Sequence, residues 1–228
     1  MQQATHGPAL VDQAYKIVLE AIIGGQVALG EKLSQAKIAQ SLNVSRQPVL
    51  QALGLLKAQG FLCSAGRRGL MVAPLDPNFV ADLYEYRAAI DTLAAGKAAR
   101  LCTPERASEG RRILRQGEAA RTSASLIDLS LADMAFHHWV YLVAGNRTVI
   151  ETMNHYWNHT RRAMCAVLSM DDEWPNRVWR EHAAIHAAIT NGNSERAQRL
   201  AHAHVERASG ALCDRLRLKL REGFGAAG

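Results

Sequence analysis

Residues 33–75 read LSQAKIAQSLNVSRQPVLQALGLLKAQGFLCSAGRRGLMVAPL, and together with Lys32 they hold six basic residues and no acidic one. The pattern predicts a helix, a turn, a second helix and a short basic hairpin, which is the order of a winged helix-turn-helix. Acidic side chains would repel a phosphate backbone, so their absence over this length favours DNA binding. The alternative is an ordinary three-helix packing unit whose charge is accidental.

Serines mark the starts of both helices. Ser34 can cap a short helix that runs to Leu42, and Ser45 can cap a second helix after a turn at residues 43–44. Pro48 is tolerated in the second helix because a first turn has no intrahelical donors to lose. The exposed N-terminal end of this second helix would read base edges in a major groove.

Gly60 ends the second helix. Two short strands at 61–63 and 70–72 would then enclose a glycine-bounded wing tip at 64–69. The candidate DNA contacts on the two helices and the wing tip are Ser34, Lys37, Ser45, Arg46, Gln47, Gln51, Arg67, Arg68 and Gly69.

This segment resembles the GntR family of bacterial transcription regulators. The resemblance is carried by residues 30–34, 38–39, 42–49, 52–53, 56, 60–61 and 66–69. The family usually has arginine where this chain has Ala36 and Leu50, at two positions where it contacts DNA. Lys37 and Gln51 follow one residue later and can partly replace those contacts, so the operator sequence does not carry over from the family.

Length and composition describe a two-domain protein. The 228 residues suffice for two domains that each bury a core. Residues 1–76 hold seven basic and four acidic residues and residues 77–228 hold 20 and 17, so the later part suggests no second nucleic-acid surface. Four scattered cysteines without a CxxC pair indicate reduced thiols. With no membrane-length apolar run and no signal peptide, a soluble cytoplasmic protein is expected.

Asp76 and Pro77 mark the domain boundary, as the cap and the first residue of a new helix. We therefore expect a DNA-binding domain over residues 1–75 and an effector-binding and dimerisation domain over residues 76–228. Breaks at proline, glycine and polar residues divide the second domain into six helical stretches, near 78–101, 104–120, 124–144, 147–169, 174–191 and 194–222. The predicted fold class is mostly α: a winged helix-turn-helix followed by an all-α antiparallel bundle.

One of these helices carries polar residues where a core needs none. In the stretch 124–144, Asp133 and His137 fall on the apolar stripe one turn apart. A buried carboxylate without a partner would cost several kcal/mol, so Asp133 must be paired or ligate something. An aspartate and a histidine at positions i and i+4 can hold one ion.

The last two helices supply two more ligands. His182 lies ten residues before Gly192 and His204 twelve residues after it, so a tight reversal at the glycine brings both to nearly the same level of the bundle. Their apolar neighbours place both on inward stripes. His202 lies about 200° around its helix from His204 and should face outward.

One aspartate and three histidines on three helices suit a divalent transition metal, with zinc favoured over nickel or manganese. The alternative is that each histidine is a satisfied core residue and that Asp133 pairs locally. The domain resembles the FCD domain of FadR-type GntR regulators through Tyr84, Arg87 and Asp91, residues 133–137, 145–146 and 181–182, Ile185, and residues 203–204. The resemblance implies a metal on Asp133, His137, His182 and His204, and six helices match the shorter, VanR-like branch. Asp91 stands where many members have glutamate.

A metal of this kind would attract an anion, and Arg87 could add a bidentate partner for an organic carboxylate. A structural salt bridge is the alternative for Arg87. Asn154, Asn158 and Arg161 recur on one helix face and could line the same cavity, with a solvated polar face as the alternative.

Two classes of function remain open. The first is a ligand-responsive regulator that binds a palindromic operator as a homodimer, with repression implied by the resemblance. The second is a metal-dependent hydrolase with an accessory DNA-binding head. A hydrolase would need a general base in reach of the metal, and hydrolysis would not explain the winged head. The regulator is therefore favoured.

Overall fold

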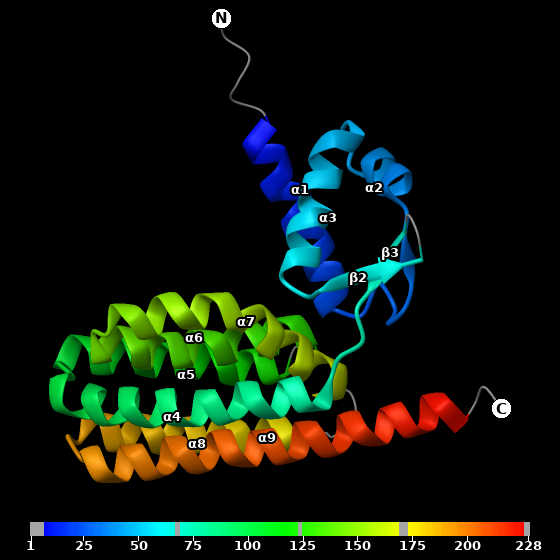
Figure 1. The fold of residues 1–228 in the computed structure, drawn as a ribbon. Coiled ribbons are helices and arrows are strands. Elements are labelled where there is room, and N and C mark those ends of the chain that lie inside the picture. Colours follow the sequence, from blue (N-terminus) through cyan, green and yellow to red (C-terminus); the bar gives the residue numbers. More distant parts are fainter. Residues whose placement is uncertain (1–6, 67–68, 123–124, 169–172, 226–228) are drawn as a thin grey trace, which may run out of the picture. The chain divides into compact units, whose positions relative to one another are not determined.

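The computed structural model describes residues 7–66, 69–122, 125–168 and 173–225. The chain divides into two compact units, Met1–Leu75 and Asp76–Gly228 (Figure 1). The fold is mostly helical with one small antiparallel sheet, as the sequence predicts. Within the ranges given above, each helix is too short or too polar to cross a membrane.

The first unit is a winged helix-turn-helix. Its elements are α1 (Gly7–Ile23), β1 (Lys32–Leu33), α2 (Gln35–Ser41), α3 (Arg46–Ala58), β2 (Leu62–Ala65) and β3 (Gly69–Val72). The three strands are antiparallel in the order β1-β3-β2. Val49, Leu53 and Leu56 form the buried stripe of α3, which packs on α1.

The two serine caps behave differently. The Ser34 hydroxyl accepts a hydrogen bond from the Lys37 amide at 3.4 Å, as predicted. Ser45 occupies the N-cap position of α3, but its side chain makes no capping hydrogen bond, so this part of the prediction is wrong. The third residue of the helix, a usual partner of such a cap, is Pro48, which has no N–H to donate.

Two elements of this unit escaped the sequence analysis. α1 buries Val18 and Ile22 against the rest of the unit, and the two residues of β1 pair with β3. The wing strands are longer than predicted, because pairing continues to Ala65 and Gly69. A Cβ at Gly69 would lie 2.8 Å from the Ala65 carbonyl oxygen, so this close approach requires glycine. The predicted wing-tip contacts Arg67 and Arg68 lie outside the described residues.

The second unit is an antiparallel bundle of helices, as predicted. Its described helices are α4 (Pro77–Leu101), α5 (Pro104–Thr122), α6 (Leu126–Ala144), α7 (Arg147–Leu168), α8 (Glu173–Thr190) and α9 (Ser194–Gly225). Asp76 caps α4 by accepting from the Asn78 amide at 2.9 Å. Gly192, with φ at 71°, forms the reversal between α8 and α9. α4 and α9 pack side by side (Figure 1).

The bundle core is aromatic in its middle. Phe136, Trp139 and Tyr141 of α6 are each at most 1% exposed and pack with Met153 of α7 and Ile189 of α8. Full burial of such side chains stabilises the fold by about 1.5–3 kcal/mol each. This packing holds α6, α7 and α8 in fixed positions, and α6 and α8 carry three of the four residues of the candidate site, Asp133, His137 and His182.

Candidate functional site

Four polar side chains meet in the middle of the bundle. Asp133 and His137 project from α6, His182 from α8 and His204 from α9. All four are buried, with exposures of 5%, 4%, 0% and 3%. One ligand atom from each lies within 4.8 Å of the others. The structure thus brings together the four residues that the sequence analysis assigned to a metal. We call them the His/Asp cluster.

The histidine rings turn their Nε2 atoms toward one another. His182 Nε2 lies 3.4 Å from Asp133 Oδ1 and 3.3 Å from His204 Nε2. His137 Nε2 lies 3.8 Å from Asp133 Oδ2. Three Nε2 atoms and a carboxylate facing one small volume are a suitable donor set for a divalent transition metal.

Outer carboxylates hold two of these rings. His204 Nδ1 lies 2.7 Å from Glu181 Oε2, and His137 Nδ1 lies 3.1 Å from Asp91 Oδ2. A carboxylate at Nδ1 favours the proton on that nitrogen and leaves the Nε2 lone pair directed into the cluster. His182 Nδ1 is buried and has no hydrogen-bond partner in the described part of the chain.

The protonation states also suit metal ligation. Burial lowers the pKa of His182 well below its ordinary value, and burial also lowers the pKa of His204 although Glu181 opposes it. Both rings are therefore neutral at pH 7. Burial alone would raise the pKa of Asp91, but His137, Arg87 and Tyr141 outweigh it and lower that pKa to about 2. Neutral imidazoles beside ionised carboxylates are the forms that bind metals.

Arg87 of α4 reaches the cluster. It is 2% exposed, and its Nη2 donates to His137 Nε2 at 3.1 Å and lies 3.6 Å from Asp91 Oδ2. The guanidinium also stacks over the rings of Tyr84 and Trp157. Its Nε is buried and unpaired within the described residues. The predicted effector residue Arg87 thus lies next to the predicted metal ligands, and its Nε–H is an unused hydrogen-bond donor among the described residues.

The other predicted effector residues do not share one environment. Asn154 is exposed, Asn158 is half-buried, and Arg161 is buried with its Nε donating to Ser130 Oγ at 3.3 Å. α7 packs on the bundle through the helix face that contains Met153 and Trp157. Asn154 and Asn158 each come one residue after these, so their side chains point about 100° away from the buried face. For Asn154 the solvated polar face is the better interpretation.

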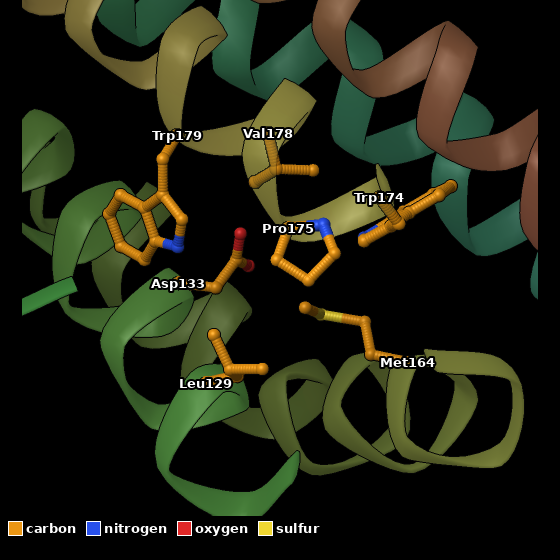
Figure 2. Close-up of a pocket in the computed structure, with 7 residues that line it drawn as sticks. All are labelled: Leu129, Asp133, Met164, Trp174, Pro175, Val178 and Trp179. Atoms are coloured by element: carbon orange, nitrogen blue, oxygen red, sulfur yellow. The ribbon is translucent and has the colours of Figure 1, made fainter. Parts of the chain in front are cut away.

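A narrow pocket opens onto the Asp133 side of the cluster (Figure 2). Apart from Asp133, it is lined by apolar side chains, namely Leu129, Met164, Trp174, Pro175, Val178 and Trp179. The indole of Trp179 packs directly against Gly117 of α5. A Cβ at Gly117 would lie 2.0 Å from the ring, so only glycine leaves room for Trp179 here. Neither Trp174 nor Trp179 was predicted from the sequence, since no motif distinguishes them from ordinary core residues.

The candidate DNA contacts in the first unit lie at the start of its helices. Ser45, Arg46, Gln47 and Gln51 are exposed along the N-terminal half of α3. Ser34 and Lys37 are exposed on α2, and Gly69 begins β3. Leu50 lies among these polar side chains and is 47% exposed. The described part of this face has polar, basic and apolar groups but no carboxylate between Lys32 and Leu75.

Comparison with known proteins agrees with these two units. The model of the gntR family of bacterial regulatory proteins matches residues 10–72, and that of the FCD domain matches residues 82–207. The chain therefore belongs to the GntR regulators with an FCD domain. It is a DNA-binding transcriptional regulator and not an enzyme, so the alternative of a metal-dependent hydrolase is set aside.

Two relatives are named as transcriptional regulators, and a solved structure shares the fold. The chain is 30% identical over 125 residues to the Nta operon transcriptional regulator of Aminobacter aminovorans, across 54% of this chain and 59% of that protein. It is 25% identical over 198 residues to the transcriptional repressor RspR of Escherichia coli K12, across 86% of each. The structure of E. coli McbR/YncC matches 89% of this chain and 96% of that one, with a TM-score of 0.76 at 16% identity, which shows the shared fold.

Proposed function

We propose that this regulator is a metal-dependent repressor that responds to a small organic carboxylate. The unit Asp76–Gly228 would hold the metal and the effector, and the unit Met1–Leu75 would bind a palindromic operator as part of a homodimer. The observation that supports this proposal most is the His/Asp cluster, in which four buried side chains converge and two of them, His182 and His204, are held neutral by burial.

Zinc suits the cluster best, with nickel or manganese as further candidates, because imidazole and carboxylate are ligands for all three. When bound, the metal would supply a Lewis-acidic position and a positive charge for an anion. Arg87 and Asp91 offset each other's charges, so a divalent ion opposed by Asp133 alone leaves one net positive charge in the buried site. A monocarboxylate would neutralise it.

Arg87 is the side chain that we expect to bind the effector. The Arg87 guanidinium donates a hydrogen bond to the lone pair of His137 Nε2. A metal bound by His137 would occupy the same lone pair. Both cannot share that lone pair. In the metal-loaded protein Arg87 is then available for a carboxylate, to which guanidinium can donate two parallel hydrogen bonds.

Repression is the favoured direction of regulation because two relatives carry that name. RspR is a transcriptional repressor, and the gluconate operon protein of Bacillus licheniformis, 24% identical over 148 residues, is another. The proposal is tested with the full chain, zinc and the DNA site recovered by a randomised-site selection. A carboxylate that raises the melting temperature of the zinc-loaded protein should weaken its operator complex by about tenfold or more, a coupling of at least about 1.4 kcal/mol. If every acid in a broad panel left operator affinity unchanged, the proposed response would be wrong.

Glu181 should be required for tight metal binding although it is not a ligand. Glu181→Ala removes the acceptor that fixes His204, and losing such a partner costs roughly 10- to 100-fold in metal affinity. Glu181→Gln keeps an acceptor oxygen and should recover part of the loss. The measurement is zinc affinity by competition with a chromophoric chelator.

Glu206→Ala is the matched control, because Glu206 pairs with the exposed His202 at 3.2 Å and not with the cluster. It should bind zinc like the unchanged protein. Equal affinities in Glu181→Ala and Glu206→Ala would show that Glu181 does not position His204 for the metal.

A further inference from the structure

The apolar pocket beside Asp133 indicates what kind of acid this regulator senses. Figure 2 shows the Asp133 carboxylate directed into a space enclosed by Leu129, Met164, Trp174, Pro175, Val178 and Trp179. The lining side chains other than Asp133 offer hydrogen bonds only through their two indole N–H groups. The part of a ligand that fills this pocket must therefore be apolar over most of its surface.

We propose that the effector is an aromatic monocarboxylic acid with one hydrogen-bond acceptor on its ring. This inference rests on the proposed function, which places the carboxylate at the metal and Arg87. The ring would contact Trp179 and Trp174, since aromatic pairs in offset or edge geometry stabilise each other beyond area burial. A sugar acid or a dicarboxylate would bury hydroxyls or a second charge without partners.

Trp174 supplies the evidence for the acceptor. The residue is 3% exposed, and its Nε1 has no hydrogen-bond partner among the described residues. Figure 2 shows the nitrogen on the side of the indole that faces the pocket. A buried donor without a partner is unfavourable, so a ligand oxygen that reaches Trp174 gains more than the same oxygen in a satisfied site.

The pocket must widen to admit a ring, and the structure indicates which wall can move. Its free volume is about 10 Å³, about the space of one water molecule. Trp179 is packed against Gly117, and Trp174 contacts the guanidinium groups of Arg177 and Arg215, whose Cζ atoms each lie 5.3 Å from its ring centre. Met164 has a flexible thioether chain and is the wall that can yield. The aromatic walls then stay in place as the ring enters.

The test uses the full chain with measured zinc content and four probes: benzoate, 4-methoxybenzoate, D-gluconate and citrate. Binding is followed by melting temperature and by tryptophan fluorescence. We expect both benzoates to bind at least about tenfold more tightly than gluconate or citrate, and 4-methoxybenzoate, whose ether oxygen only accepts, to bind more tightly than benzoate. Binding of gluconate or citrate in preference to the benzoates would overturn this inference and leave the proposed function standing.

Trp174→Phe separates the contribution of the ligand's hydrogen-bond acceptor from that of its apolar ring. It keeps an aromatic ring but removes the N–H, so benzoate should still bind while the preference for 4-methoxybenzoate falls to about twofold or less. Trp139→Phe is the matched control, because Trp139 Nε1 donates to the Arg106 carbonyl at 2.9 Å and lies outside the pocket. An unchanged preference in Trp174→Phe would refute the acceptor. Zinc-loaded protein that binds no acid at all would overturn this inference and the proposed effector together.

Discussion

His182→Ala and His204→Ala should each purify without the metal that the unchanged protein carries at about one ion per chain. Both side chains are fully enclosed, and their Nε2 atoms lie 3.3 Å apart in the cluster, so no water could replace either at low cost. A ligand held at a thousand times its dissociation constant stabilises the fold by about 4 kcal/mol. For a protein of this size that corresponds to roughly 8 to 16 °C in melting temperature.

A large-to-small change in a core also destabilises by itself, so the decisive quantity is the effect of a chelator. Adding a chelator should lower the melting temperature of the unchanged protein and leave that of His182→Ala or His204→Ala nearly constant. His202→Ala is the control within the same helix. Its side chain is 49% exposed and pairs with Glu206, so metal content and chelator response should match the unchanged protein. Equal metal loss in His202→Ala and His204→Ala would refute the assignment of His204 as a ligand.

The cluster could be predicted from sequence because helical geometry fixes where residues point. One turn separates Asp133 from His137 on an apolar stripe, and the reversal at Gly192 sets His182 and His204 at one level. These arguments need only the helix period and one turn. The same period correctly places His202 on the exposed side of α9.

What surrounds the cluster could not be predicted, because it depends on how separate helices pack. Glu181 lies about 100° around α8 from His182, and only the packing of α9 against α8 brings it to His204. Trp174 and Trp179 gain their significance only from the side chains of α6 and α7 opposite them. Within the first unit, Ser45 makes no capping hydrogen bond, and the sequence shows one reason, since Pro48 removes one of the two usual donors.

Arg46→Ala should weaken operator binding by roughly 10- to 100-fold, which corresponds to a loss of 1–3 kcal/mol for a base-reading arginine. Arg46 is the first residue of α3 and is exposed, and the N-terminal end of such a helix is the part that enters a major groove. The measurement is the affinity of the full chain for its selected site, and for unrelated DNA, across a series of salt concentrations. The loss should be larger on the selected site, because a base contact carries sequence information that a phosphate contact lacks.

Lys57→Ala is the matched control for Arg46→Ala. Lys57 is exposed on the same helix and carries the same charge, but it lies in the last turn of α3, about 16 Å further along the helix axis. Its removal should change affinity by less than about twofold, because a charge at that end is screened from the groove. If both variants lost affinity equally on selected and unrelated DNA, Arg46 would act only through bulk charge. Recognition would then have to come from the other exposed polar residues of α3, with Gln47 and Gln51 the next to replace.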